Sequence, residues 1–291
     1  MSNSAVSTGK CILSGEHSVV YGEPAVVTTL AKTVSVYILP GTAKHSPFDE
    51  HIFSLFGARY NLITTRLSLQ VQSKIPCGVG LGSSAAYAYA VFQALAKYFE
   101  VTLSKETYYQ LVNDAEKYVH SNPSGVDAYA AVYGGTTLFL PQNTTKMPKV
   151  REITLSWPHT FLLINSGKAQ ESTGEMVNYV AINLRKDSNL LAVIKNMGTT
   201  TKKCVSQLEN GRFSGAVLDE NQKYLEQLGV VGSRAKKMIR KIQNTGGHAK
   251  ITGAGGRQSG SGFILAYSPE LSKIEALCDT AAWESFRSTV Q

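Results

Sequence analysis

The chain has 291 residues, of which 43% are hydrophobic and 17% charged, and its formal net charge at pH 7 is +8. These values are typical of a globular protein with one large or two modest domains. No apolar run reaches the length that spans a bilayer, and residues 1–10 contain no apolar signal segment, so we expect a cytoplasmic protein without membrane contacts. The four cysteines follow no metal-ligand or redox spacing, which predicts reduced thiols.

The first third of the chain is predicted to be rich in β-strands. Residues 26–30 and 33–38 carry β-branched and aromatic side chains, and 67–71 alternate apolar and polar side chains with period two. The segment 40–66 lacks such a pattern and is expected to be an irregular surface excursion.

Two helices are predicted next. The first begins near Ser83 and continues to about Ala96, and the second follows Ser104, a plausible N-cap, and ends near Val119. A break at 122–125, with proline and glycine, follows the second helix.

The polar segment 141–148 has a proline at each end and is interpreted as a linker. We therefore predict two α+β lobes, 1–145 and 146–291, with the functional site between them. In the second lobe, strands are expected at 160–164 and 262–267, and helices near 172–185, 188–210, 213–227, 233–245 and 269–282.

The densest basic stretch, 234–241, is the candidate for a nucleic-acid-binding surface. Its apolar residues Ala235, Met238, Ile239 and Ile242 recur at helical spacing. This pattern favours an amphipathic helix with a solvated basic face, and no zinc-finger or RNA-binding signature supports the other interpretation.

The most informative segment is 76–86, Pro-Cys-Gly-Val-Gly-Leu-Gly-Ser-Ser-Ala-Ala, between a predicted strand and a predicted helix. Its alternate glycines let backbone N–H groups approach a polyanion, and the helix N-terminus adds unpaired donors. The segment is no P-loop, because it lacks the Gly-x-x-x-x-Gly-Lys-Ser/Thr pattern. The candidate phosphate-binding residues are Gly78, Val79, Gly80, Leu81, Gly82, Ser83 and Ser84.

Two carboxylates, Glu116 and Asp127, flank a Pro–Ser–Gly turn within 116–127. The turn can bring Asp127 back towards Glu116. Of two carboxylates near a phosphate loop, one can hold Mg²⁺ and the other can orient or deprotonate an alcohol. A hydroxyl at the start of the first helix can also bind the metal.

Two further segments carry candidate residues. In 9–22, Lys10 precedes a short apolar strand and Glu16 and His17 lie in the turn after it. A lysine ammonium beside an alcohol lowers the pKa of the alcohol and screens phosphate charge. The glycine-rich segment 250–262 is predicted to form a second backbone cradle that closes the site.

Together these four segments resemble the GHMP kinase superfamily and, within it, the mevalonate kinases, and the resemblance extends over nearly the whole chain. The segment 9–22 contains a Gly-Glu-His-x-Val-Val-Tyr-Gly core, 76–86 a Gly-Leu-Gly-Ser-Ser-Ala-Ala loop, and 116–127 a Glu-x-x-x-His-x-Asn-Pro-Ser-Gly-Val-Asp string with Ser121 where the family has glycine. The resemblance implies an N-terminal lobe like the second domain of ribosomal protein S5 and a ferredoxin-like C-terminal lobe.

The resemblance also implies the reaction and the residue roles. ATP would phosphorylate mevalonate to mevalonate 5-phosphate in isoprenoid precursor synthesis, with Lys10 and Asp127 flanking the reacting hydroxyl. Ser84 and Glu116 would hold Mg²⁺, 78–83 would wrap the triphosphate, and Glu16 and His17 would contact the acceptor. Mevalonate, ATP and Mg²⁺ are the expected ligands, a homodimer is considered, and no nucleic-acid partner is expected.

The chain departs from the family pattern after Gly256, where Arg257–Gln258–Ser259–Gly260–Ser261–Gly262 replaces a shorter glycine run. We expect Arg257 to touch nucleotide phosphates or the acceptor carboxylate, with solvent exposure as the alternative. Three other functions stay open at this point. These are a sister kinase acting on phosphomevalonate or another hydroxyl of mevalonate, a non-catalytic nucleotide-binding regulator, and an RNA-binding protein.

Overall fold

The computed structural model describes residues 3–120, 123–141 and 148–290. These residues form two compact units. The first unit takes its residues from 1–10, 29–77 and 82–134, and the second from 11–28, 78–81 and 135–291. The predicted linker lies mostly in 142–147, outside the described residues, so the boundary at 145 remains a prediction.

Two long strands run through both units. These are β1 (Ser4–Ser14) and β2 (Ala25–Pro40), and the two stretches predicted as separate strands are one continuous β2. In the first unit, β2 pairs antiparallel with β3 (Leu67–Ser73), from Val34 opposite Ser73 to Pro40 opposite Leu67. Alternate residues of this half of β2 are buried, which matches a sheet with one covered face.

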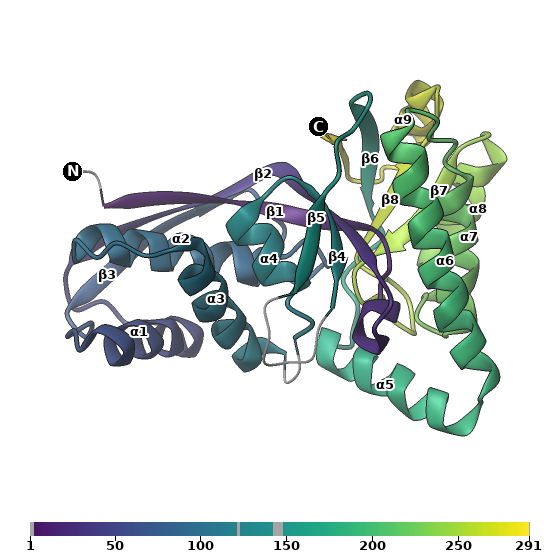
Figure 1. The fold of residues 1–291 in the computed structure, drawn as a ribbon. Coiled ribbons are helices and arrows are strands. Elements are labelled where there is room, and N and C mark those ends of the chain that lie inside the picture. The colour runs from purple at the N-terminus through teal and green to yellow at the C-terminus, as the bar shows by residue number, and fades with distance from the viewer. Residues whose placement is uncertain (1–2, 121–122, 142–147, 291) are drawn as a thin grey trace. The chain divides into compact units, whose positions relative to one another are not determined.

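Four helices complete the first unit: α1 (Pro47–Tyr60), α2 (Ser83–Tyr98), α3 (Lys105–Val119) and α4 (Val126–Tyr133). Figure 1 shows them on one face of the strands. The predicted helices after Ser83 and Ser104 are confirmed, and the Ser104 hydroxyl accepts from the Thr107 N–H.

The expectation of an irregular segment over 40–66 is wrong, because α1 occupies its centre. Ser46 and Asp49 form a capping box at the start of this helix, with Pro47 in its first position. Ile52, Phe53 and Phe56 are buried, so the helix contributes to the core. The sequence does not predict α1, because polar and apolar residues are poorly separated around the axis of this helix.

The second unit contains two sheet regions. The first four residues of β2 pair with β4 (Thr136–Leu140), which pairs with β5 (Lys149–Glu152). A separate antiparallel sheet has the order β7-β8-β6-β9. Its strands are β7 (His248–Thr252), β8 (Phe263–Tyr267), β6 (His159–Asn165) and β9 (Ser285–Val290).

The helices of this unit are α5 (Thr173–Lys186), α6 (Asn189–Glu209), α7 (Ala216–Gln227), α8 (Ser233–Asn244) and α9 (Leu271–Thr280), besides the short η1 (Ser18–Tyr21). They match the predicted helices within a few residues. α7 and α8 pack against β7, and α9 packs against β6 (Figure 1). The sequence pattern predicts none of α4, β4, β5, β7 and β9.

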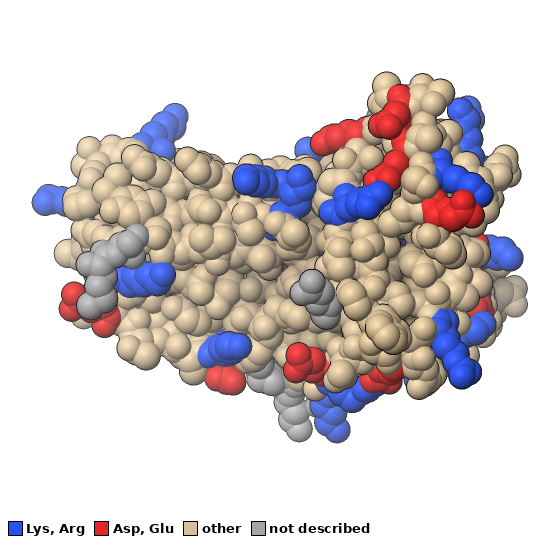
Figure 2. Space-filling model, turned by 90° about the horizontal axis from the view of Figure 1, so that it is seen from above, with Lys and Arg blue, Asp and Glu red and all other residues tan. Residues whose placement is uncertain are grey.

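The basic stretch over 234–241 forms α8, whose apolar residues Ala235, Met238, Ile239 and Ile242 are buried in the core of the second unit. The predicted amphipathic helix is therefore confirmed. On the face in Figure 2, Lys and Arg side chains are scattered singly or in small groups, and several stand beside acidic side chains. Within the described residues, no helix combines the length and apolar character needed to cross a membrane.

Candidate active site

The glycine loop before α2 has the backbone geometry that phosphate binding needs. Gly78, Gly80 and Gly82 have φ angles of 70°, 86° and 67°, a region that favours glycine. Gly82 is the N-cap of α2 and supplies no side-chain cap to the first-turn N–H groups. These donors are available to an anion, and the helix dipole favours negative charge there. Residues 78–81 belong to the second unit and Gly82 begins a segment of the first.

Lys10 and Asp127 form an ion pair in the first unit, with Lys10 Nζ 2.9 Å from Asp127 Oδ1. Lys10 lies within β1, whereas the sequence analysis placed it before the strand. Asp127 lies in the first turn of α4, after Gly125 in the left-handed conformation. The lysine side chain is 5% exposed and the aspartate side chain 30%, so the carboxylate retains access to a ligand.

The lysine also lies directly against the glycine loop. A Cβ atom placed on Gly82 would be 2.7 Å from Lys10 Cγ and 2.9 Å from Cε. Any side chain at position 82 would therefore displace the lysine. Glycine at position 82 therefore permits both the left-handed backbone turn and the observed position of the Lys10 side chain.

Glu116, near the end of α3, is the most perturbed carboxylate of the first unit. Its side chain is 1% exposed, and neither oxygen makes a full hydrogen bond with any described residue. Burial, and then the charge of Asp127, raise its pKa from 4.5 to about 8, while the nearby Ser84 hydroxyl and Lys10 oppose the shift. His120 Nε2 lies 3.7 Å from one oxygen, and burial lowers the pKa of this histidine.

This unsatisfied carboxylate fits a hard cation. A buried carboxylate with so few close partners favours a bound proton or a metal, and Mg²⁺ prefers oxygen ligands such as Glu116 and the Ser84 hydroxyl. The described residues contain no group of three His, Cys, Asp or Glu side chains arranged to hold a metal. An ion at Glu116 would therefore need oxygens from phosphate or water to complete its shell.

In the second unit, Glu16 is fully engaged by two side chains. Lys250 Nζ contacts one carboxylate oxygen and Asn221 Nδ2 donates to the other at 2.9 Å. Lys250 is 0% exposed and also donates to the carbonyls of Ile12 and Ile251 at 3.1 and 2.8 Å. No role of Lys250 or Asn221 is predictable from the sequence, because their partner Glu16 lies far away along the chain.

His17 follows this carboxylate in a strained turn with a φ angle of 58°. Its Nε2 atom is 2.9 Å from the carbonyl oxygen of Ala254. Burial lowers the pKa of His17, and the backbone hydrogen bond opposes this only in part. The ring is thus neutral near pH 7 and is held against the glycine-rich segment.

The two glycine-rich segments touch in the second unit, and closure of the site by 250–262 remains a prediction. A Cβ atom on Gly80 would be 2.7 Å from the carbonyl oxygen of Thr252, and one on Gly262 would be 2.5 Å from that of Val79. The Phe263 N–H also donates to the Val79 carbonyl at 3.3 Å. Residues 252–263 therefore brace the first half of the phosphate loop.

Arg257 lies over an aromatic ring in this structure. Its guanidinium carbon is 4.2 Å from the centroid of the Tyr179 ring on α5, which is cation–π geometry. Its backbone N–H donates to Glu171 at 3.4 Å. The expected contact with phosphate or with an acceptor carboxylate remains a prediction.

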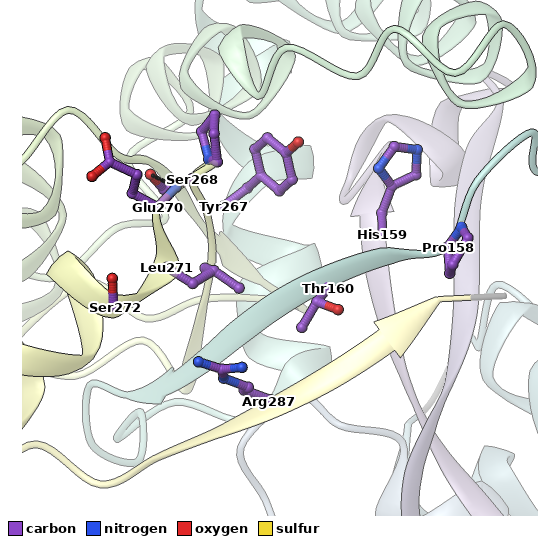
Figure 3. Close-up of a pocket in the computed structure, with 10 residues that line it drawn as sticks. Pro158, His159, Thr160, Tyr267, Ser268, Glu270, Leu271, Ser272 and Arg287 are labelled. Carbon is purple, nitrogen blue, oxygen red and sulfur yellow. Dashed lines mark hydrogen bonds between the residues drawn. The ribbon is translucent and has the colours of Figure 1, made fainter.

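A separate hollow of about 500 Å³ lies at the start of β6, the end of β8 and the first turn of α9 (Figure 3). Its lining includes His159, Tyr267 and Arg287, and none of the site residues predicted from the sequence. Arg287 is held by Glu275 in a two-pronged ion pair. The hollow is therefore distinct from the phosphate loop.

Residues 50–135, which include α2, α3, α4 and the loop before α2, match the model of the GHMP kinases N terminal domain. The fold and the site thus define a GHMP kinase. The mevalonate kinase of Archaeoglobus fulgidus is 31% identical over 284 residues, covering 93% of this chain and 95% of that protein. The chain belongs to the mevalonate kinase family.

Solved structures agree on the fold. The L. major mevalonate kinase in complex with R-mevalonate superposes with a TM-score of 0.81 at 22% identity, covering 99% of this chain and 95% of that one. The Methanococcus jannaschii mevalonate kinase gives a TM-score of 0.83 at 22% identity, covering 100% and 99%. The expected two-lobed GHMP kinase fold is confirmed.

Proposed function

We propose that this protein transfers the γ-phosphate of ATP to the 5-hydroxyl of mevalonate. The observation that carries the proposal is the Lys10–Asp127 pair, at 2.9 Å, with Lys10 packed against Gly82 at the start of α2. An ammonium and a carboxylate stand together where a helix N-terminus favours phosphate. Membership of the mevalonate kinase family supports mevalonate as the acceptor.

In the proposed reaction the hydroxyl oxygen of mevalonate attacks the γ-phosphorus, and the bond to the β,γ-bridging oxygen breaks to release ADP. Asp127, 30% exposed, orients the hydroxyl and accepts its proton as the new bond forms. Lys10 stabilises the charge that develops on the attacking and transferred oxygens. Phosphoryl transfer depends mainly on positioning and charge neutralisation, so this small set of groups is sufficient.

The phosphates are assigned to the backbone N–H groups of 78–84, where three glycines have positive φ and α2 has an open N-terminus. Glu116 and Ser84 would hold Mg²⁺, which fits a buried carboxylate whose oxygens accept no full hydrogen bond from any described residue. When bound, this ion would neutralise phosphate charge.

His17 is proposed to contact the acceptor through its fixed, neutral ring. Glu16 is also proposed to serve acceptor binding. Because Lys250 and Asn221 hold its oxygens, it would do so by fixing the turn that carries His17. A cytoplasmic location and a homodimer complete the proposal.

The test is a coupled ADP-release assay of the purified chain with mevalonate, phosphomevalonate, galactose and homoserine. The proposal expects turnover with mevalonate, and ³¹P NMR of the product should show a phosphomonoester on C5. Turnover confined to another alcohol would overturn the substrate. ATP binding without turnover on any acceptor would indicate a regulator, and salt-dependent RNA binding without ATP turnover would indicate the RNA-binding alternative.

A further inference from the structure

A second lysine lies against the glycine loop, at its first glycine. A Cβ atom placed on Gly78 would be 3.1 Å from Lys168 Cε and 3.4 Å from Lys168 Nζ, and all these atoms belong to the second unit. We propose that Lys168 binds the phosphates of the nucleoside triphosphate at the Gly78 end of the loop. The inference rests on the proposed function, because it takes the loop to be the nucleotide site.

The turn that carries Lys168 is rigidly held, although the lysine itself is exposed. Asn165 Oδ1 accepts from the Gly167 N–H at 2.9 Å, and the Ser166 hydroxyl donates to the Gly262 carbonyl at 2.7 Å. The Gly262 N–H donates back to the Gly167 carbonyl at 2.9 Å. These bonds fix the backbone that precedes Lys168.

The same contacts connect this turn to the glycine loop. Gly262, bonded to Gly167, approaches Val79 so closely that its own Cβ would lie 2.5 Å from the Val79 carbonyl oxygen. The base of Lys168 and the backbone of 78–81 are therefore parts of one packed structure. A ligand on the loop would therefore have to order only the lysine side chain and not the backbone that carries it.

The ammonium of Lys168 also lacks a competing partner. Within the described residues, no carboxylate lies within 4.0 Å of its Nζ, whereas Lys203 and Lys273 both form ion pairs. Arg234 adds positive charge beside the turn that carries Lys168, because its Nη1 lies 3.9 Å from the position of a Cβ on Gly167. Glu171, which follows Lys168 closely in the sequence, carries the opposite charge and accepts from the Arg257 N–H. An unpaired cation beside a backbone anion site is suited to phosphate.

Lys168 has a counterpart at the other end of the loop. In the first unit Lys10 lies against Gly82, just as Lys168 lies against Gly78 in the second. Lys10 is buried and paired with Asp127, which suits the reacting hydroxyl, whereas Lys168 is exposed and forms no ion pair with the residues that the structure describes. The difference assigns Lys168 to nucleotide affinity and Lys10 to the chemical step.

The test is calorimetric titration of the full-length wild type, Lys168→Met, Lys168→Arg and Lys237→Met with ATP, ADP and AMP in the absence of acceptor. Lys168→Met should weaken ATP binding roughly five- to thirtyfold, as expected for one partly screened charge contact. AMP binding should change much less, Lys168→Arg should retain most of the affinity, and high salt should reduce the difference from wild type. Lys237, an exposed lysine on α8, provides the charge-matched control and should bind ATP as the wild type does.

Equal ATP affinity of wild type and Lys168→Met, with equal thermal stability, would overturn the inference and leave the proposed function intact. An equal loss in Lys237→Met would also overturn it, by showing a general effect of net charge. A wild type that binds no nucleotide would instead overturn the proposed function, and the inference with it.

Discussion

Lys10 Nζ lies 2.9 Å from Asp127 Oδ1, and the same lysine packs its aliphatic chain against Gly82. A strand, a helix N-terminus and a glycine turn therefore meet around one ammonium group. The pair combines the two properties that phosphoryl transfer to an alcohol needs, a base for the hydroxyl and positive charge for the phosphate.

Replacing Asp127 by asparagine should lower kcat by roughly 10²–10⁴, because the amide cannot accept the proton of the hydroxyl. The Kd for ATP should change little, since the phosphates are assigned to the 78–84 backbone. Steady-state kinetics with calorimetric ATP titration measure both quantities. Asp114→Asn, at an exposed α3 residue paired with Lys117, is the matched control. A normal kcat in Asp127→Asn would remove this residue from the mechanism.

Glu116 should make the metal-free protein less stable as the pH rises. Its folded-state pKa is raised from 4.5 to about 8, so the folded protein keeps a proton that the unfolded chain releases. This contribution to stability is complete below pH 4.5 and is lost as the pH approaches 8. Thermal unfolding from pH 4.5 to 8.5 should show the Tm of wild type falling relative to that of Glu116→Gln, because the lowered pKa values of His17 and His120 act alike in both proteins.

The same variant tests the proposed metal role. Glu116→Gln should raise the Mg²⁺ concentration needed for half-maximal activity, because a neutral amide is a poorer ligand for a hard cation than a carboxylate. Identical profiles of Tm against pH in wild type and Glu116→Gln would contradict the raised pKa of Glu116. An unchanged Mg²⁺ requirement would make Glu116 purely structural.

Replacing Gly80 by alanine should weaken both folding and nucleotide binding. The φ angle of 86° is unfavourable for alanine, and its Cβ would lie 2.7 Å from the Thr252 carbonyl oxygen. The free energy of unfolding should fall by about 1–3 kcal/mol, measured by urea denaturation. Gly174→Ala is the control, since that glycine lies in α5 with nothing within 4 Å of the new methyl group. Wild-type stability and ATP affinity in Gly80→Ala would contradict this prediction by showing that the loop accommodates a side chain at position 80.

Replacing Lys250 by methionine should cost about 3–5 kcal/mol of folding free energy, because Glu16 would be left in the interior without its cation. Guanidinium unfolding measures this loss. Adding Glu16→Gln should restore part of the stability by removing the unpaired charge. Lys203→Met, which breaks an exposed pair with Glu220, should change stability by less than about 1 kcal/mol. No recovery in the double variant would contradict the coupling of Lys250 with Glu16.

The sequence predicted most of the helices because their signals are local. Ser104 and Ser172 cap helices by bonding N–H groups three residues later, which a short window of sequence reveals. The phosphate loop was predictable for the same reason, since its glycines and the start of α2 are adjacent. The first helix, α1, was missed although Ser46 and Asp49 form a local capping box, because the apolar residues after them do not form a clear stripe.

Contacts between distant segments could not be predicted in this way. Lys250 and Glu16 are 234 positions apart, and nothing in either neighbourhood indicates that the two side chains share a buried site. Lys168 is similar, because only folding of the turn after β6 brings it to Gly78. The candidate residues were identifiable by type, but their partners depend on tertiary packing.

The complete burial of Lys250 has a practical consequence for labelling experiments. Its ammonium is 0% exposed and its donors are directed at Glu16, Ile12 and Ile251, so an amine-selective reagent cannot reach it in the native protein. Acylation at this position would therefore require opening of the second unit. Mass-spectrometric detection of a modified Lys250 peptide would give this chain a reporter of unfolding that needs no added probe.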